Sequence, residues 1–431
     1  MVNLNLTISR MVAESGIFTA KLHEHAVFSA KWLRLLLFAG VFVGLVAPQQ
    51  AAADAGFRKW KRDFGAFAQR KGIKKSTVQR AFKGINAPNP EVLELARYQP
   101  EFRQKLWMYF DSRVNETSIE RGQQEKKNWS RWLARIERQY GISANVLLAI
   151  WSMESTYGEA MKRPKSLRNV VHSLSTLAYA DKRRRKFARS QLIASMKILQ
   201  SGQVRADQLR GSWAGAMGHT QFIPTSYLIY GQDIDKNGKK DIWTSVPDAL
   251  ATAANLLKRN GWRTGRTWGY EVRVPKRLHK QSGKTRQLSA WAKLGITRVA
   301  GRKFPASNDR AELRFPAGKS GPAFLMLRNF FVLKRYNNSD KYALAVGHLA
   351  DQIGGAGELV HQIPRPFPKL KLEQRKELQR LLARMGLYDK DIDGNIGSGT
   401  RAAIRRAQIK MGLNPTGFES PGFLSRLRKR S

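Results

Sequence analysis

The chain of 431 residues contains no cysteine and few acidic residues. The lack of cysteine excludes disulfide bonds, thiolate metal sites, a cysteine nucleophile and a lipid anchor attached to cysteine. Only 32 residues are Asp or Glu, against 77 Lys or Arg, which gives a formal net charge of +45. This excess of positive charge favours polyanionic partners, and nucleic acid, anionic lipid headgroups and carboxylate-bearing wall polymers all fit it.

Long hydrophobic runs are also scarce, because only residues 35–46 form one, with twelve consecutive apolar or Gly residues. Lys31 and Arg34 precede this run, and the small residues 51–53 follow it. The run is too short to span a bilayer and is typical of a secretory signal peptide. We therefore expect residues 1–53 to be a signal peptide whose true start lies after Met1, and we expect an exported protein. Cleavage would remove four basic and two acidic residues and leave a charge of +43. Export argues against nucleic acid as the partner.

Helical periodicity dominates the mature chain, with apolar residues at helical spacing in residues 57–82, 90–97 and 129–257. Residues 245–248, Ser-Val-Pro-Asp, are typical of a helix start, with an N-cap serine, an early proline and an acid at N3. Aromatic and branched residues at 270–274 and 324–333 predict short strands in a small β-containing subdomain.

The end of the chain is predicted to form a separate unit. A helix is expected over residues 342–353, and three prolines within residues 363–368 then indicate an extended linker. Three short helices are predicted after it, at residues 372–385, 400–411 and 419–427. The predicted organisation is a signal peptide (1–53), a main domain (54–360), a linker (361–370) and a C-terminal domain (371–431).

Glu154 is the first candidate for chemistry, because Leu147, Ile150, Trp151 and Glu154 occupy positions i, i+3, i+4 and i+7 of a predicted helix. Apolar neighbours would desolvate the carboxyl group and raise its pKa, as a general acid requires near neutral pH. Spacing alone leaves an alternative, in which Glu154 is structural and either pairs with a basic residue or turns to the helix edge.

Residues 150–158, IWSMESTYG, resemble the catalytic-glutamate segment of lytic murein transglycosylases of the membrane-bound lytic transglycosylase B family. Three further motifs agree in the expected order, at residues 98–102 (YQPEF), 211–224 (GSWAGAMGHTQFIP) and 335–337 (RYN). The resemblance implies a mainly α fold, with a lysozyme-like catalytic core and extra helical and small β-containing subdomains.

The resemblance also implies a periplasmic enzyme that cleaves the MurNAc–GlcNAc β-1,4 bond of peptidoglycan without hydrolysis. In that reaction the C6 hydroxyl of the sugar closes a 1,6-anhydro ring, and Glu154 acts first as acid and then as base. An intramolecular nucleophile can be worth about 7–11 kcal/mol, so no second carboxylate is needed to activate water. Glu159 would point about 140° away from Glu154 around the helix and is expected in solvent.

Four further residues are implied to bind the glycan: Ser212, Gln221, Tyr336 and Asn337. For residues 214–218, close backbone packing is an equal alternative, because Gly and Ala let chain segments approach. Tyr336 and Asn337 could also belong to a turn that caps a helix starting near Lys341. His219 stands where the family has an aromatic residue, and we expect it to be structural.

Residues 233–241 fit the pattern D-x-D-x-N-G-x-x-D, with Gly238 at the sixth position of an EF-hand-like loop. The twelfth position is Thr244 rather than a bidentate Glu, and three lysines lie within the loop. Family members with a longer loop close it with a later Asp, here Asp248, which could instead complete the capping box of its helix. The expected reaction needs no cofactor, and a weak structural calcium is the candidate metal. Its candidate ligands are Asp233, Asp235, Asn237, Asp241 and Asp248.

Residues 391–404 resemble the peptidoglycan-binding-like domain that accompanies wall enzymes, and Ile396, Ile404 and Leu413 are predicted to fill its core. A small interaction domain that shares only this fold is the alternative. The expected partner is the peptidoglycan glycan strand, with non-specific attraction of the basic chain to the wall and to anionic membrane. Two other functions stay open: a hydrolytic muramidase that uses Glu154 with water, and a non-catalytic protein that binds wall or polyanions.

Overall fold

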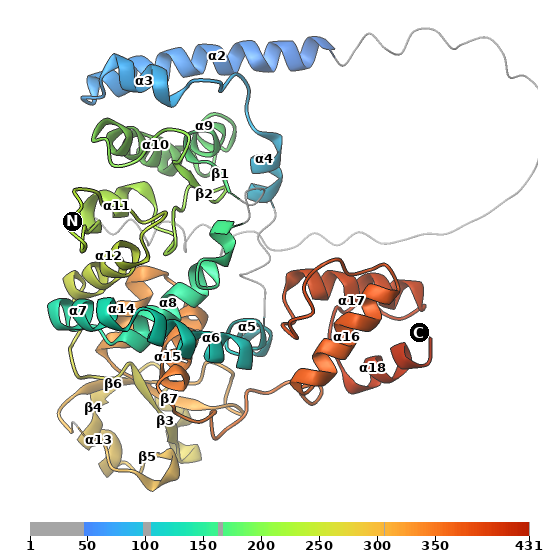
Figure 1. Cartoon of the computed structure of the whole chain (residues 1–431). Coiled ribbons are helices and arrows are strands. Elements are labelled where there is room, and N and C mark those ends of the chain that lie inside the picture. Colours follow the sequence, from blue (N-terminus) through green and yellow to red (C-terminus); the bar gives the residue numbers. More distant parts are fainter. Residues whose placement is uncertain (1–46, 98–104, 163–166, 306, 431) are drawn as a thin grey trace, which may run out of the picture.

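The computed structural model describes residues 47–97, 105–162, 167–305 and 307–430 (Figure 1). The apolar run of the expected signal peptide and the motif at 98–102 lie outside the described residues. Within the described part of the chain, no helix combines the length and the apolar character needed to cross a bilayer.

Helices make up most of the structure. Those up to residue 259 are α2 (Ala47–Arg70), α3 (Lys75–Ala81), α4 (Pro90–Arg97), α5 (Leu106–Arg113), α6 (Glu116–Asn128), α7 (Ser130–Tyr140), α8 (Ala144–Ser155), α9 (Val170–Ala180), α10 (Arg185–Gln200), α11 (Pro224–Tyr230) and α12 (Val246–Arg259). The later ones are α13 (Leu288–Lys293), α14 (Arg328–Tyr336), α15 (Asp340–Ile353), α16 (Leu372–Arg384), α17 (Ser398–Lys410) and α18 (Pro421–Arg428). The expectation of a mainly α protein with small sheets is confirmed.

The predicted helix start at residues 245–248 is confirmed in part. The Ser245 side chain accepts a hydrogen bond from the Asp248 backbone N–H, and Pro247 lies in the first turn of α12. The reciprocal bond of a capping box is absent from this pair, because both Asp248 oxygens accept from other backbone groups, at Ile234 and Asp241. The expected role of Asp248 in a capping box was therefore wrong.

Two antiparallel sheets complete the fold. The smaller one pairs β1 (Arg168–Asn169) with β2 (Arg210–Gly211). The larger one has the order β4-β6-β7-β3-β5, with β3 (Gly269–Arg273), β4 (Thr285–Gln287), β5 (Thr297–Arg298), β6 (Arg310–Arg314) and β7 (Ala323–Met326). It has its own apolar core, which includes the fully buried Trp291 and Leu313.

The prediction of one strand over residues 324–333 was wrong in its second half. The strand β7 ends at Met326, and α14 begins at Arg328. Asn329, Phe330 and Leu333 point into the core at helical spacing. Aromatic and branched residues suit either element, so composition did not place the boundary.

The C-terminal helices α16, α17 and α18 enclose a separate core that contains Ile396 and Ile404, with Leu413 packed against it. The linker before them forms no helix or strand, and it is bound to the main domain. Arg365 makes two hydrogen bonds to the carboxylate of Asp111, at 2.9 and 3.1 Å. In addition, Arg375 of α16 pairs with Glu116 of α6 at 2.6 Å.

Trp107 of α5 is the centre of this junction, and only 2% of it is exposed. The guanidinium groups of Arg365 and Arg401 lie 5.6 and 5.5 Å from its ring centre. The rings of Phe367 and Phe418 contact it edge-on, at 5.5 and 5.3 Å. The linker and the C-terminal unit therefore both pack on the same tryptophan of the main domain.

Candidate active site

The helix α8, which ends with Ser155, runs through the centre of the main domain. Leu147, Ile150 and Trp151 are at most 2% exposed, as the spacing predicted. The helix is buried on nearly all sides rather than on one face, and Glu154 is one of its few partly exposed residues. Glu154 is thus partly rather than fully buried among these apolar neighbours, and the raised pKa expected from them stays a prediction. Glu154 therefore lies at the border between core and solvent.

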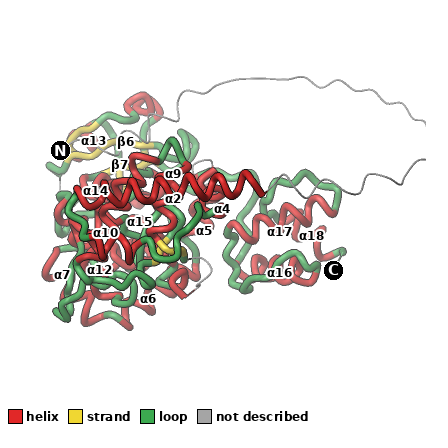
Figure 2. The backbone as a smooth tube through the Cα atoms, turned by 90° about the horizontal axis from the view of Figure 1, so that it is seen from above, coloured by secondary structure: helices red, strands yellow, loops and turns green. Residues whose placement is uncertain are grey.

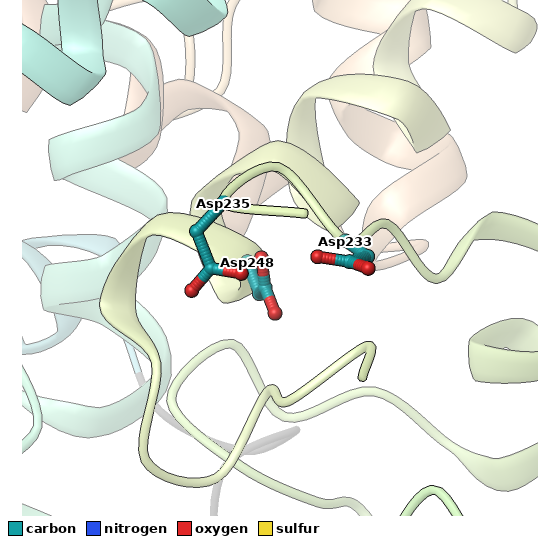
Figure 3. Close-up of side chains that lie close together, drawn as sticks. All are labelled: Asp233, Asp235 and Asp248. Carbon is teal, nitrogen blue, oxygen red and sulfur yellow. The ribbon is translucent and has the colours of Figure 1, made fainter. Parts of the chain in front are cut away.

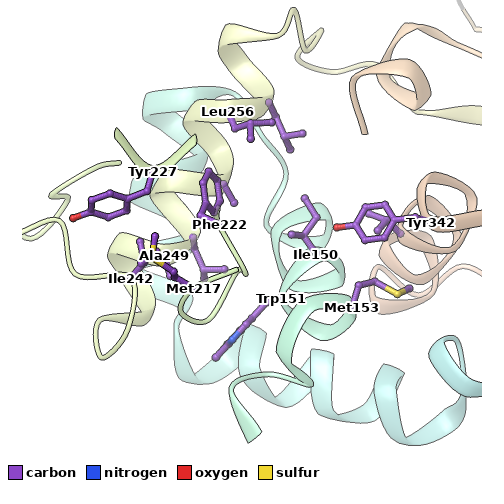
Figure 4. Close-up of a cluster of buried hydrophobic side chains, with 14 of the residues drawn as sticks. Ile150, Trp151, Met153, Met217, Phe222, Tyr227, Ile242, Ala249, Leu256 and Tyr342 are labelled. Carbon is purple, nitrogen blue, oxygen red and sulfur yellow. The ribbon is translucent and has the colours of Figure 1, made fainter. Parts of the chain in front are cut away.

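Tyr342 of α15 holds the carboxyl group of Glu154. Its hydroxyl donates a hydrogen bond of 2.7 Å to Glu154 Oε1, across 188 residues of sequence. The ring is buried, and Figure 4 shows it projecting from α15 toward Ile150 and Met153 of α8, with Trp151 on the other side of α8. Burial and the nearby Glu154 charge raise the pKa of Tyr342 well above its usual value. Tyr342 therefore stays a neutral donor and fixes one oxygen of Glu154.

Tyr336 extends this arrangement to the segment at residues 211–224. Its ring stacks on Tyr342 with 6.3 Å between centroids, and its hydroxyl donates to the Thr220 carbonyl at 2.6 Å. Burial, followed by the Glu154 charge, raises its pKa well above the usual value. The Tyr336 hydroxyl thus donates its hydrogen bond to the backbone beside Gln221. Tyr336 supports Tyr342 by packing, and the direct sugar contact that the resemblance implied stays a prediction.

Three consecutive residues with positive φ follow Glu154 and Ser155: Thr156 (53°), Tyr157 (54°) and Gly158 (85°). Left-handed backbone is uncommon for any residue with a side chain and is a genuine outlier for β-branched Thr and bulky Tyr. Such strain persists where surrounding contacts impose it, and it concentrates at functional sites. Gln221 has φ of 49°, so strained backbone occurs in both segments that carry the family motifs.

His219 joins the two segments. Its Nδ1 accepts a hydrogen bond from Trp151 Nε1 at 3.2 Å, and its carbonyl accepts one from Ser155 Oγ at 2.6 Å. A Cβ on Gly158 would lie 2.7 Å from the His219 ring, so only glycine fits there. Burial lowers the pKa of His219 to about 4. The neutral ring acts as an acceptor that positions Trp151, in line with the structural role expected for it.

Ser212 and Gln221 lie in the tight loop after β2, and both are partly exposed. Ser212 Oγ accepts hydrogen bonds from the backbone N–H groups of Ala214 and Ala216, while Gln221 Nε2 donates to the Gly218 carbonyl at 2.9 Å. A Cβ on Gly218 would lie 2.3 Å from the Ile242 carbonyl oxygen. The loop thus combines the close packing that its glycines indicated with polar groups that remain accessible.

Asn337 is exposed and lies apart from these contacts, as the C-cap of α14. The next helix is capped by Ser339, whose hydroxyl accepts from the Tyr342 N–H, so neither Tyr336 nor Asn337 caps it. The contacts therefore connect Glu154 with Tyr336 and, through Thr220, with the segment of Gln221. Tyr342 was missed in the sequence, where its only signal was a tyrosine within the apolar stripe of a predicted helix.

Glu159, the nearest carboxylate after Glu154 in the sequence, is engaged elsewhere. It binds Arg121 at 2.6 Å and Lys162 at 3.0 Å. The hydrogen bond from Arg121, followed by that from Lys162, lowers the pKa of Glu159. An ionised carboxylate between two cations is a poor base and a poor nucleophile, so the site relies on Glu154.

The candidate metal loop gathers three of its five predicted ligands, Asp233, Asp235 and Asp248, with ligand oxygens within 4.8 Å of one another (Figure 3). Asp248 is fully buried, and burial, with added repulsion from the two other carboxylates, raises its pKa to about 6. A hard cation fits this set, because it would offset the repulsion among three clustered oxygen ligands.

The other two predicted ligands, Asp241 and Asn237, form hydrogen bonds with nearby residues of the chain. Asp241 accepts hydrogen bonds from the backbone of Trp243 and Thr244 and from the Thr244 hydroxyl. Asn237 donates its amide to Asp235. The roles of Asn237 and Asp241 as metal ligands therefore stay predictions.

Comparison with known proteins gives two family matches. The transglycosylase SLT domain model matches residues 56–351, and the putative peptidoglycan binding domain model matches residues 371–427. The chain is 29% identical over 224 residues to membrane-bound lytic murein transglycosylase B of Escherichia coli K12. That match covers 51% of this chain and 60% of the relative, so the chain matches less than two thirds of that protein's length.

Solved structures of two Pseudomonas aeruginosa proteins are also similar. SltB3, solved in complex with NAG-NAM-pentapeptide, is 43% identical with a TM-score of 0.68; the match covers 86% of this chain and 99% of SltB3. The soluble lytic transglycosylase SltB1 is 25% identical with a TM-score of 0.61, over 69% of this chain and 98% of SltB1.

Proposed function

The chain belongs to the transglycosylase SLT domain family, and on that premise we propose that it is a lytic transglycosylase that cleaves the MurNAc–GlcNAc β-1,4 bond of peptidoglycan without hydrolysis. The observation that carries this proposal is the hydrogen bond of 2.7 Å by which the Tyr342 hydroxyl holds the carboxyl group of the partly exposed Glu154. The P. aeruginosa relative solved with NAG-NAM-pentapeptide supports the substrate class.

The reaction has two proton transfers through Glu154. The protonated carboxyl group gives its proton to the glycosidic oxygen, the bond from that oxygen to C1 of MurNAc breaks, and GlcNAc leaves with a free hydroxyl. The C6 hydroxyl of the same MurNAc then bonds to C1 and returns its proton to Glu154. Atoms and charge balance within one sugar chain, no water is consumed, and the enzyme regains its starting state.

Tyr342 has a positioning role in this scheme. Its hydrogen bond to Glu154 Oε1 favours the ionised carboxylate, which forms as the first proton leaves. The same bond fixes the direction of the other carboxyl oxygen of Glu154. Ser212 and Gln221 are the partly exposed polar groups that we propose to contact the N-acetyl groups of the glycan. We also propose that the protein is exported to the periplasm and that residues 371–431 bind the wall.

The mass of the products tests the proposed reaction. Purified sacculi digested with the wild-type protein should release muropeptides that end in 1,6-anhydro-MurNAc, each lighter by one water than the hydrolytic product. The measurement is mass spectrometry before and after borohydride treatment, which adds hydrogen only to reducing ends. Products that carry reducing ends would establish the muramidase alternative, and a lack of any release would leave a wall-binding protein.

We further propose that Asp233, Asp235 and Asp248 hold a weakly bound calcium ion that stabilises the loop before α12. Adding millimolar calcium to metal-free protein should raise the melting temperature by a few degrees, through binding to the folded state alone. The Asp235→Asn variant should lose most of this rise, whereas Asp207→Asn, at an exposed aspartate outside the cluster, should keep it. An equal rise in all three proteins would contradict the site.

A further inference from the structure

One end of the molecule, formed by α2, α3 and α10, carries a large excess of positive charge. Residues 55–83 contain ten Lys or Arg and one acidic residue, and residues 181–200 contain seven and one. Asp181, the acidic residue of the second segment, is paired with Arg184. We call the exposed Lys and Arg side chains of these two segments the basic cap.

The two segments of the basic cap form one continuous surface. Gln200 of α10 accepts a hydrogen bond from the Lys74 N–H and donates one to the Gly72 carbonyl. Arg80 of α3 donates to the Leu199 carbonyl at 3.2 Å. Figure 1 places α2 and α3 at one edge of the molecule, and the view from above in Figure 2 shows α2 lying across it. Arg189 of α10 also lies over the rings of Phe64 and Phe67 of α2, at 5.0 and 4.8 Å from their centres, so the two segments pack together at this edge.

On α2, the charge lies opposite the core. The buried positions are Phe57, Phe64 and Ala68. The exposed basic positions are Arg58, Lys59, Arg62 and Arg70, and the exposed Asp63 lies at the edge of the same face. At 100° per residue the four basic positions fall within about 120° of one another, and their mean direction is roughly opposite to that of the buried set. In the described part of the chain no ion pair joins these four side chains to an acidic residue, so basic side chains outnumber acidic ones four to one on this face.

An aromatic side chain lies between the two faces of α2. The Trp60 ring stacks on Phe57 and Phe64, with centroid distances of 5.6 and 5.2 Å, and remains partly exposed. A helix with a basic face flanked by a half-buried tryptophan matches the chemistry of a membrane surface, where phosphate lies beside acyl chain. In the sequence, α2 follows the apolar residues 35–46 directly.

We propose that the basic cap docks on anionic lipid headgroups and holds the enzyme on a membrane surface. The interaction is electrostatic and uses phosphate groups as the partners of the unneutralised Lys and Arg side chains. It uses none of the residues at Glu154 and goes beyond the proposed cleavage of glycan. Because a Debye length is about 8 Å at physiological ionic strength, docking should weaken steeply with added salt.

The test is sedimentation of the full chain with lipid vesicles. Vesicles of phosphatidylglycerol and phosphatidylethanolamine should bind the protein, and vesicles of phosphatidylcholine should not. The triple variant Lys59→Glu, Arg62→Glu, Arg70→Glu should bind the anionic vesicles roughly tenfold or more weakly. The matched control is Lys293→Glu, Arg302→Glu, Lys303→Glu, which makes the same change in net charge at exposed residues of the sheet subdomain and should bind nearly as the wild type does.

Three outcomes would overturn the proposal. Equal losses in both triple variants would show that net charge alone attracts the protein to lipid. Unchanged binding of the first variant would exclude the basic cap, and loss of sacculus binding with vesicle binding intact would assign the surface to wall polymer. Melting temperatures of both variants check that the fold is kept. Cleavage of sacculi in the absence of lipid should be unchanged in both, so failure of this proposal and failure of the proposed reaction are distinguishable.

Discussion

The Glu154→Gln variant is expected to cleave peptidoglycan about 10³-fold more slowly than the wild type, or not measurably. A single general acid or base contributes about 10²–10⁴-fold, and here one carboxyl group makes both proton transfers. Glutamine keeps the size of the side chain and can accept the hydrogen bond from Tyr342, but it has no proton of suitable acidity to give. The measurement is the rate of muropeptide release from sacculi, with sedimentation of protein with sacculi measured in parallel.

Two comparisons make this result specific to the chemistry. Binding to sacculi should persist in Glu154→Gln, because the C-terminal unit and the glycan contacts are unchanged. Tyr342→Phe keeps the stacking on Tyr336 and removes only the hydroxyl, so it should lower kcat by roughly 10-fold, the cost of one hydrogen bond to a charged group. Cleavage by Glu154→Gln at a rate near that of the wild type would exclude Glu154 as the acid and the base.

The second large effect concerns Asp351 at the end of α15. Its Oδ2 accepts a hydrogen bond from Trp268 Nε1 at 2.9 Å, and burial raises its pKa from 3.8 to about 6. The folded state therefore binds the proton more tightly than the unfolded state does. Stability from this group is present below about pH 4 and falls as the pH rises to about 6, above which the folded protein carries a charged, poorly solvated carboxylate.

The Asp351→Asn variant should therefore raise the free energy of unfolding at pH 8 by up to about 3 kcal/mol, from 1.36 kcal/mol per unit of pKa shift. Its amide oxygen can still accept from Trp268. The gain should shrink as the pH falls below 6 and vanish near pH 4. Denaturant unfolding at several pH values measures this, with Asp389→Asn as an exposed control that changes little. A gain that does not depend on pH would contradict the origin of the effect in a buried charge.

Structural features that depend on interactions within one helical turn could be predicted from the sequence. The start of α12 follows from Ser245 and Pro247, because an N-cap and an early proline act within one turn. The end of β7 could not be found in this way. Leu327 donates its N–H to the Trp268 carbonyl before α14 begins, and that partner lies 59 residues earlier in the chain. The boundary therefore depends on a tertiary contact.

The candidate site shows the same division. The family motif identified Glu154, but its exposure at the end of a helix buried on nearly all sides depends on the packing of α15 against α8. Its hydrogen bond to Tyr342 joins residues 188 positions apart. Asp248 shows how a local pattern can mislead, because its position at N3 suits a capping box. Two backbone N–H groups of the preceding loop, at Ile234 and Asp241, bind its carboxylate instead.

The packing of the linker and the C-terminal unit on Trp107 has a consequence for deletion experiments. Truncation before residue 361 would strip Arg365, Phe367, Arg401 and Phe418 from this indole and leave the Asp111 and Glu116 carboxylates without their arginine partners. A shortened enzyme would thus expose a large apolar side chain and two uncompensated charges. Its loss of activity would combine damage to the remaining fold with the loss of wall contacts, whereas substitutions on the outer surface of α17 and α18 would separate the two.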